Sequence, residues 1–226
     1  MRTFTILREL LPLTLSLVRD QRRWLYFGSP VPRTPAFHAR RAERIVAALG
    51  RLGPTFVKMG QVFAGRNDLL PGPYAAAFAT LTDRVPPVPF AEVERVILEN
   101  YGHPYTELFE HFDPTPIAAA SLGQVHRAVH QGKDVAVKVL RPGIERRVAA
   151  DSAVLDLAAR LVERWAPPAR RLEPRRFAAT VIRSTELELD LRLEAAGADE
   201  LAEVMEKDGY MSAPKVLWEG VGKRVL

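Results

Sequence analysis

The chain has 226 residues, of which 47% are hydrophobic and 26% charged, a composition typical of soluble globular proteins rather than disordered chains. It contains no cysteine, which excludes disulfide bonds, thiolate zinc sites, iron–sulfur clusters and a cysteine nucleophile. The net charge of +5 is uneven, because the first 51 residues carry ten arginines and only three acidic residues. This basic start indicates an anionic partner surface, with a solvated helix face as the alternative.

The amino-terminal segment, residues 1–35, is basic and amphipathic. Its longest apolar stretch, residues 10–18, is too short for a membrane span, which needs about 20 apolar residues. No secretory signal is recognisable either, so we expect a cytoplasmic protein. Residues 4–27 predict one amphipathic helix whose end places Arg22 and Arg23 beside aromatic residues, a mixture suited to lipid headgroups. The alternative is a helix docked on the protein's own core.

Residues 36–110 have a helical pattern that prolines interrupt, and we expect them to form a helical extension. A stiff extended link is predicted over the proline-rich residues 85–89. We predict four helices in this extension. The first covers residues 36–52, the second begins at Gly53 and Pro54, the third covers 74–81 and the fourth covers 90–101.

The pattern changes beyond residue 110, and residues 111–226 mix strands with long helices. Alternating apolar residues over 124–140, with a turn at residues 131–134, predict a β-hairpin. Further elements are predicted as helices over residues 144–165 and 175–207 and as strands over 216–218 and 224–226. The expected fold class is α+β, a small antiparallel sheet with long helices that follows the helical extension.

The second hairpin strand carries Lys138 in a V-A-V-K sequence. A loop of small residues, a hairpin and a V-A-x-K strand follow the order of a protein-kinase amino-terminal lobe, where the lysine holds nucleotide phosphates. A lone V-A-V-K is weak evidence, because a strand lysine is often only an edge residue. Kinases also need a helix glutamate to hold this lysine, and Glu194 lies on a predicted helix downstream, with the helix over 144–165 inserted between them.

The predicted helix around Glu194 is strongly acidic. Residues 186–206 carry eight acidic side chains against Arg192 alone, so nearby cations are expected. Lys138 and Lys58 are the candidates for that role. The alternative, a solvated acidic face, better explains the three acidic residues farther along the helix, Glu200, Glu203 and Glu206.

Four motifs in one order point to a known family: KMGQ at 58–61, AAASLGQVH at 118–126, VAVKV at 135–139 and ELDLRLEA at 188–195. Together with the inserted helix they resemble the UbiB/AarF/ADCK family of atypical kinases over nearly the whole chain. The resemblance implies a protein-kinase-like amino-terminal lobe preceded by a family-specific extension whose KxGQ segment lies over the nucleotide site. It also implies binding of ATP with Mg²⁺ and support of ubiquinone or related isoprenoid-lipid biosynthesis at the membrane.

The resemblance assigns roles to individual residues. Lys138 is expected to hold the nucleotide phosphates and Glu194 to orient Lys138. The nucleotide-binding loop comprises Ala118, Ala119, Ala120, Ser121, Leu122 and Gly123. The residues expected to gate the site are Lys58 and Gln61 of KxGQ and Glu188 and Asp190 of the ExD motif. Since this loop has alanines where other kinases have glycines, and Cβ atoms hinder close approach to phosphate, we expect altered nucleotide handling.

Some features of a complete kinase are not expected in this chain. Nothing after Glu194 supplies a catalytic-loop Asp and Asn or a metal-binding Asp, so the Mg²⁺ ligands are expected from a carboxyl-terminal lobe. Two residues depart from the family pattern: Leu191 replaces an aromatic residue common after ExD, and Gly197 replaces an asparagine. The five histidines form no spaced metal-binding cluster, so no metal site is expected within the chain.

Two functions remain open from the sequence. The first is the amino-terminal part of a UbiB-type atypical kinase or ATPase, peripheral to a membrane, with a nucleotide, an anionic membrane or isoprenoid lipid, and quinone-biosynthesis proteins as partners. The alternative is a catalytically inactive module that binds lipid or nucleotide. We do not expect a nucleic-acid partner, because the basic start brings no docking motif and no aromatic stacking platform.

Overall fold

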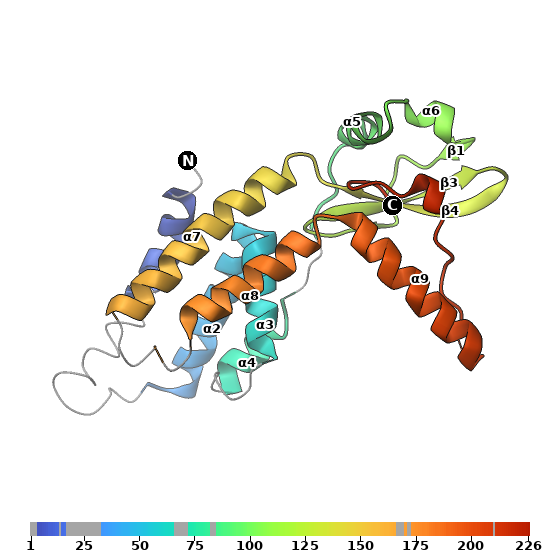
Figure 1. Cartoon of the computed structure of the whole chain (residues 1–226). Coiled ribbons are helices and arrows are strands. Elements are labelled where there is room, and N and C mark those ends of the chain that lie inside the picture. Colours follow the sequence, from blue (N-terminus) through green and yellow to red (C-terminus); the bar gives the residue numbers. More distant parts are fainter. Residues whose placement is uncertain are drawn as a thin grey trace. The chain divides into compact units, whose positions relative to one another are not determined.

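The computed structural model describes residues 4–13, 15–16, 33–65, 72–81, 85–165, 170, 173–209 and 211–226. Long helices and one small antiparallel sheet confirm the predicted α+β class (Figure 1). The chain forms two compact units: a helical unit of Met1–Asp83 with Val148–Ile182, and a sheet unit of Arg84–Arg147 with Arg183–Leu226. The division predicted at residues 35 and 110 stays a prediction. Among the described residues, no helix is both long and apolar enough to cross a membrane.

The helical unit contains the predicted helices of the extension. Helix α2 (Pro35–Leu52) begins at Thr34, whose side chain accepts a hydrogen bond from the Phe37 amide. It ends at Gly53, whose φ of 100° lies in the region that glycine adopts without strain. Helix α3 (Pro54–Ala64) follows at once, and α4 (Gly72–Phe78) is shorter at its end than the predicted helix over 74–81.

Residues 4–13 are helical and dock on the core of the helical unit. Ile6 is 2% exposed and lies in one cluster with residues of α2, α3 and the segment around α4: Leu49, Leu52, Phe56, Phe78 and Leu81. The alternative of a helix docked on the protein's own core is therefore correct for this face. Residues 17–27 of the predicted amphipathic helix, with Arg22 and Arg23, lie outside the described residues.

Gly60, the glycine of the KMGQ motif, has a structural reason to lack a side chain. A Cβ atom at this position would lie 2.2 Å from Leu81 Cδ1 and 3.1 Å from Leu49 Cδ1. Helix α3 therefore approaches its neighbours closely at this point, with Phe56 and Val57 buried on the same helix.

Replacing Gly60 by valine is expected to lower the free energy of unfolding by about 1–2 kcal/mol, because the added atoms overpack this contact. Gly50→Val is the matched control, since a Cβ atom at Gly50 of α2 meets nothing within 4 Å. Denaturant unfolding followed by circular dichroism measures both variants. Gly50→Val should not destabilise the chain, because valine favours a helix over glycine and nothing lies in its way. A Gly60→Val variant as stable as Gly50→Val would contradict the close packing at Gly60.

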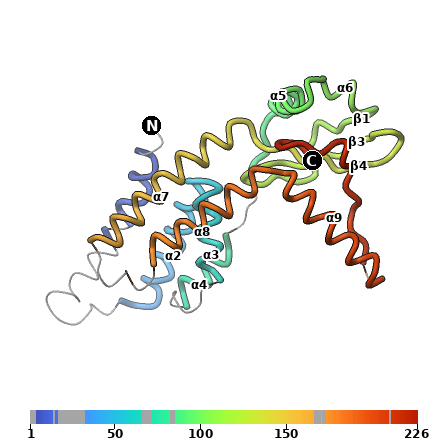
Figure 2. Tube along the Cα trace, in the orientation of Figure 1, coloured from blue at the N-terminus to red at the C-terminus, as the bar shows by residue number. Residues whose placement is uncertain are grey.

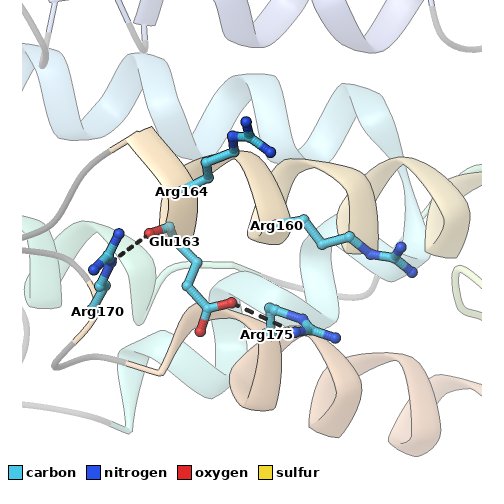
Figure 3. Close-up of a pocket in the computed structure, with 5 residues that line it drawn as sticks. All are labelled: Arg160, Glu163, Arg164, Arg170 and Arg175. Carbon is cyan, nitrogen blue, oxygen red and sulfur yellow. Dashed lines mark hydrogen bonds and ion pairs between the residues drawn. The ribbon is translucent and has the colours of Figure 1, made fainter.

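Helices α7 (Ile144–Trp165) and α8 (Pro174–Leu187) link the two units, as the chain path in Figure 2 shows. Within the helical unit they pack through Leu155, Ala159, Ala178 and Val181. The Phe177 ring of α8 also lies 4.2 Å from the Phe63 ring of α3. Five described residues, between the end of α7 and the start of α8, line an open pocket (Figure 3).

The sheet unit is built around the predicted hairpin. Strands β3 (Gly123–His130) and β4 (Lys133–Leu140) pair antiparallel along their whole length. On its other edge, β3 pairs with two short strands, β1 (His111–Phe112) and β2 (Ala118–Ala119). The turn is tighter than the predicted turn over 131–134, because Gln131 and Gly132 both have positive φ angles, of 51° and 71°, and close it as a pair.

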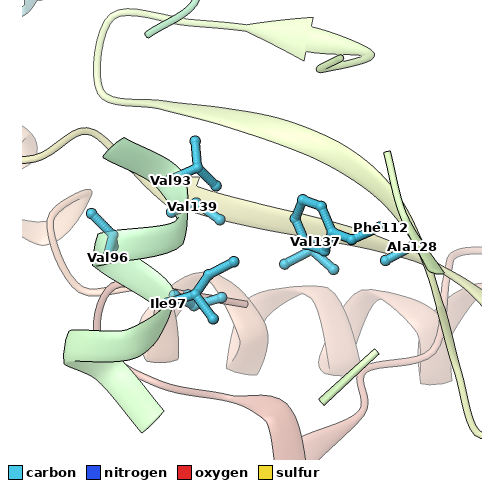
Figure 4. Packing of buried hydrophobic residues seen from close by; sticks show 8 residues of the cluster. Val93, Val96, Ile97, Phe112, Ala128, Val137 and Val139 are labelled. Atoms are coloured by element: carbon cyan, nitrogen blue, oxygen red, sulfur yellow. The ribbon is translucent and has the colours of Figure 1, made fainter. Parts of the chain in front are cut away.

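One face of the sheet is covered by α5 (Phe90–Tyr101), which forms as predicted, and is followed by α6 (Tyr105–Leu108) (Figure 1). The spacing of its apolar residues directs one side of α5 onto the strands. The buried core that results is shown in Figure 4 and contains Val93, Val96, Ile97, Phe112, Ala128, Val137, Val139 and Val225.

The long helix predicted over residues 175–207 is wrong, because the chain breaks it. Helix α8 ends at Leu187 and α9 (Leu191–Asp208) begins four residues later. Between them, the amide of Leu189 bonds to the carbonyl of Glu186, while Asp190 caps α9 by accepting from the Arg192 amide. The ExD motif therefore forms a turn and a helix cap instead of continuous helix.

The carboxyl-terminal strands were also predicted incorrectly in part. Residues 216–218 form no strand, and the chain turns through a short 3₁₀ helix, η2 (Trp218–Gly220). Only Val225 of the second predicted strand bridges the sheet, opposite Val139 of β4. The Tyr101 hydroxyl donates to the Gly220 carbonyl at 2.5 Å, and burial raises the pKa of Tyr101 to about 12. Tertiary contacts hold this segment in place, and the local alternation of apolar and polar residues does not predict such contacts.

Candidate nucleotide-binding site

Lys138 and Glu194 form the polar centre of the sheet unit. Val137 and Val139 point into the core beneath α5, so Lys138, which lies between them on β4, points to the opposite face. There its Nζ atom donates to both carboxylate oxygens of Glu194, each at 2.6 Å. The two side chains are 32% and 46% exposed, so the pair is accessible to a ligand. Of the two candidate cations, Lys138 is therefore the one that the structure places against Glu194.

The backbone holds both partners in place. Lys138 exchanges two hydrogen bonds with Leu226, through its amide at 2.6 Å and its carbonyl at 2.9 Å. Glu194 lies in the first turn of α9, where Asp190 caps the helix and also accepts two hydrogen bonds from the Arg192 guanidinium. Hydrogen bonding from Arg192 holds the pKa of Asp190 below its ordinary value. Asp190 therefore positions the helix that carries Glu194.

Leu191 and Gly197, the two departures from the family pattern, have different surroundings. Leu191 is 1% exposed and its amide bonds to the Lys223 carbonyl, so the leucine anchors the start of α9. Gly197 lies exposed on α9 with nothing within 4 Å of the position of a Cβ atom. Farther along the helix, three side chains are exposed as the solvated-face interpretation predicts: Glu200, Glu203 and Glu206.

The alanine-rich loop is a tight corner between β2 and β3. Its residues Ala118 and Ala119 pair with β3, and the corner closes where the Ala120 amide bonds to the Gly123 carbonyl at 2.8 Å. Ser121 and Leu122 are buried. A Cβ atom on Gly123 would lie 2.7 Å from the Val139 carbonyl oxygen, so the two backbones approach closely beside Lys138.

Arg141 is a positioning residue that sequence reasoning missed. It follows β4 directly, and its amide bonds to the Leu122 carbonyl at 2.8 Å. Its guanidinium donates to the carbonyls of Ala120 at 2.9 Å and Pro86 at 2.7 Å. Arg141 therefore ties the alanine-rich loop to the proline-rich link. Its only sequence signal is its place after the V-A-V-K strand, which does not reveal these contacts.

Gln124 and His126 of the same motif form a buried hydrogen-bonded chain. Because the Asp113 carbonyl oxygen can only accept, His126 Nδ1 donates to it at 2.8 Å. His126 Nε2 then accepts from Gln124 Nε2 at 2.9 Å, and Gln124 Oε1 accepts from the Val88 amide. This arrangement requires a neutral imidazole. Burial lowers the pKa of His126 from its usual 6.5, although the bond to Asp113 partly offsets the effect.

The pH dependence of stability is expected to reflect His126. Since its pKa is lower in the folded chain, the unfolded chain binds more protons below pH 6.5. The stability that neutral His126 provides is therefore complete above pH 6.5 and is lost as the pH falls through the folded-state pKa. Denaturant unfolding between pH 7 and pH 5 should show this loss, and His126→Asn should reduce its slope. An imidazole pKa at or above 6.5 by NMR titration contradicts the expectation.

The expected gating residues lie in different compact units. Lys58 and Gln61 are half-buried on α3 of the helical unit, three residues apart along the helix. Glu188 and Asp190 belong to the sheet unit. The expected meeting of KxGQ with ExD stays a prediction. No group of three or more His, Asp or Glu side chains able to hold a metal ion occurs within the part of the chain that the structure describes.

A family match agrees with this geometry. The family described as the ABC1 atypical kinase-like domain matches residues 80–226, which include the sheet, Lys138 and Glu194. The chain belongs to this family. The match confirms the resemblance to atypical kinases, with three of the four motifs inside the matched residues, and with it the kinase-like fold of the sheet unit.

Relatives from three organisms carry the name "Probable protein kinase UbiB". The one from Marinobacter nauticus is 38% identical over 225 residues, which are 99% of this chain and 40% of the relative. Those from Xylella fastidiosa and Xanthomonas campestris pv. campestris are 39% and 41% identical, over 90% of this chain and 38% of each relative. This ABC1-family chain therefore resembles UbiB-type atypical kinases and spans about 40% of their length.

A solved structure shows a similar fold. It is described as the complex structure of Rv3197 with erythromycin from Mycobacterium tuberculosis. The similarity covers 84% of this chain and 48% of that one, with a TM-score of 0.55 and 28% sequence identity. The sheet unit makes up about half of the chain. Since the similarity covers 84% of the chain, it also includes part of the helical unit.

Proposed function

We propose that this chain is the nucleotide-binding, amino-terminal part of a UbiB-type atypical kinase or ATPase. The observation that carries the proposal is the Lys138–Glu194 ion pair, with both carboxylate oxygens on one ammonium group. A strand lysine held by a helix glutamate is the arrangement with which kinases hold nucleotide phosphates. The ABC1 family match and the UbiB names of the relatives support the same function.

The residues of the sheet unit fit a nucleotide. The Lys138 ammonium is partly exposed and keeps hydrogen-bonding capacity beyond its two contacts with Glu194. Bound ATP would supply the phosphoryl group. The role of this chain would be to bind and orient the ATP phosphates. Glu194 keeps Lys138 directed across the sheet face, while Arg141 and Gly123 hold the loop of residues 118–123 against β4. The loop backbone is therefore held by hydrogen bonds that do not depend on the nucleotide.

In kinase sites, one or two protein side chains hold Mg²⁺ together with the nucleotide phosphates. In this proposal its ligands come from the part of the longer relatives that this chain does not match. Titration calorimetry of the 226-residue chain with ATP and ADP, each with and without Mg²⁺, tests the nucleotide function. Saturable binding is expected. Absence of saturable binding under all four conditions overturns the proposal.

For the complete protein we propose a role in ubiquinone or related isoprenoid-lipid biosynthesis, as the UbiB names of its relatives suggest. Quinone-biosynthesis proteins and an isoprenoid lipid are the partners in this proposal. Loss of the quinone in cells that produce a Lys138→Met form of the full-length protein at normal levels is the expected result. Normal quinone content in such cells contradicts the role.

A second candidate function, peripheral lipid binding, is favoured by the outer face of the first helix. Phe4, Leu7, Leu11 and Leu15 recur at helical spacing and are each at least half exposed, opposite the docked face with Ile6. Exposed apolar side chains in an amino-terminal segment whose sequence is basic suit the headgroup region of an anionic membrane. In this proposal the protein is peripheral to the cytoplasmic face of a membrane.

Vesicle flotation is expected to recover the chain with anionic vesicles, and Leu7→Glu with Leu11→Glu should abolish most of this recovery. The matched control is Leu201→Glu with Val204→Glu, two apolar residues about half exposed on α9. Neutralising Arg22 and Arg23 tests the basic part of the same segment. Recovery that is equal for the Leu7/Leu11 variant and the unaltered chain rules out this membrane surface.

A further inference from the structure

Four arginines line one pocket in the helical unit, at the corner where α7 ends and α8 begins, and Figure 3 shows their side chains. We call it the arginine pocket. It is open and has a volume of about 500 Å³. Neither the nucleotide function nor the membrane face uses it. Its lining comprises four arginines and a single glutamate: Arg160, Glu163, Arg164, Arg170 and Arg175.

Two of the four guanidinium groups have carboxylate partners. Arg160 pairs with Asp156, one turn earlier on α7. Arg175 lies 3.7 Å from the Glu163 carboxylate, an ion pair too long for a hydrogen bond. These two acidic side chains are therefore already paired with arginines, and the Glu163–Arg175 ion pair is a long one.

The other two guanidinium groups have no carboxylate partner among the described residues. Arg170 donates from Nε to the backbone carbonyl of Glu163 at 2.8 Å, which positions the guanidinium without compensating its charge. The Arg164 guanidinium lies 5.6 Å from the centre of the Trp165 ring. Arg164 and Arg170 thus bring two uncompensated positive charges to one pocket.

The sequence around the corner adds no compensating acid. Residues 166–172, which connect the helices, contain two arginines and no Asp or Glu. The first turn of α8 has no acidic residue either. Glu173, just before it, pairs with Arg176 at 3.0 Å. Among the described residues, Arg164 and Arg170 therefore leave an excess of about two positive charges at this corner, and a bound anion would be attracted to both.

We propose that the arginine pocket binds a phosphate group. A phosphate dianion matches the two uncompensated guanidinium charges, and its oxygens accept the paired N–H donors that arginine presents in a fixed fork. The group can belong to a soluble phosphorylated compound or to a lipid headgroup. Trp165, which is 74% exposed beside the pocket, offers an apolar surface to either source.

The test uses the 226-residue chain with inorganic phosphate as the ligand, in the Lys138→Met background so that the proposed nucleotide site does not contribute. Phosphate binding is followed by NMR of the arginine Nε–H signals. Saturable binding is expected, and Arg164→Gln with Arg170→Gln should weaken it by about tenfold. Acetate at equal ionic strength should not reproduce the signal changes.

Arg40→Gln with Arg44→Gln is the matched control, because both arginines are exposed on α2 of the same unit and the change in net charge is identical. This control should alter the affinity by less than about twofold. Circular dichroism melting shows that each variant is folded. Equal weakening by both double variants, or no saturable phosphate binding at all, overturns the proposal.

Vesicles distinguish the two sources of the phosphate group. If the group belongs to a lipid, phosphatidic acid vesicles should bind the chain, and both inorganic phosphate and the Arg164/Arg170 change should reduce that binding. If the ligand is soluble, inorganic phosphate should bind while the Arg164/Arg170 change leaves vesicle binding unaltered. Either result supports a phosphate site.

Discussion

The Lys138→Met variant is expected to bind ATP at least about tenfold more weakly than the unaltered chain, because it loses the ammonium group that contacts the phosphates. Methionine keeps the length and the apolar stem of lysine, so β4 retains its packing on the sheet face opposite the core. Titration calorimetry on the 226-residue chain measures the effect. The matched control is Lys133→Met, an exposed lysine at the start of the same strand.

Loss of stability does not account for this expected loss of affinity. Both side chains of the Lys138–Glu194 pair are partly exposed, and ion pairs of that kind contribute only about 0–1 kcal/mol to folding. Thermal melts of the variant and the unaltered chain should therefore nearly coincide. If Lys133→Met weakens ATP binding as much as Lys138→Met does, the assignment of Lys138 to the phosphates is wrong.

Glu194→Gln separates the orienting role from the binding role. Glutamine keeps the shape of the side chain but offers one carbonyl oxygen in place of the two carboxylate oxygens that hold Lys138. Lys138 keeps its charge but loses its orientation, so the loss of affinity should be smaller than for Lys138→Met. Glu203→Gln, an exposed position on the same helix, is the control and should have no effect.

Gly123→Ala is expected to destabilise the sheet unit by about 2–3 kcal/mol. A single methyl group is sufficient, because its carbon would lie 2.7 Å from the Val139 carbonyl oxygen. The obstacle is backbone within the β3–β4 pairing, so it cannot move aside as a side chain can. Since Val139 adjoins Lys138, the strand that carries the lysine must shift, and ATP affinity should fall as well.

Gly197→Ala is a control for which the opposite change in the free energy of unfolding is expected. Gly197 lies exposed in α9 with open space around it, and alanine favours a helix over glycine by about 1 kcal/mol. Denaturant unfolding should therefore show a gain for Gly197→Ala and a loss for Gly123→Ala. A Gly123→Ala variant as stable as the unaltered chain would mean that β3 and β4 do not approach as closely as described.

Local patterns predicted the elements whose signals lie within a few neighbouring residues. The helix over 90–101 and the helix over 144–165 were predicted with their observed bounds, because apolar residues repeat with the helical period inside each. The hairpin followed from alternation, and only the turn was shorter than predicted. Prolines and glycines marked the end of α2 at Gly53 because they act on the backbone of their own residue.

The break at the ExD motif shows where local patterns fail. Acidic and apolar residues continue through 188–190 with a helical rhythm, so the sequence favoured one helix. In the structure, burial of Leu189 and Leu191 and capping by Asp190 stabilise a turn instead. Those contacts involve partners such as the Lys223 carbonyl, far away in sequence, and they outweigh the propensity of three residues.

By itself the sequence determined the residue types of the candidate site: a strand lysine, a helix glutamate and an alanine-rich loop, recognisable together through their order. Only the tertiary structure decided that Lys138 meets Glu194, that Arg141 secures the loop, that Gly123 must lack a side chain and that arginines of α7, α8 and their connection share one pocket. The physical reason is distance along the chain, because these contacts form only when the strands and helices pack and bring separated residues within hydrogen-bonding range.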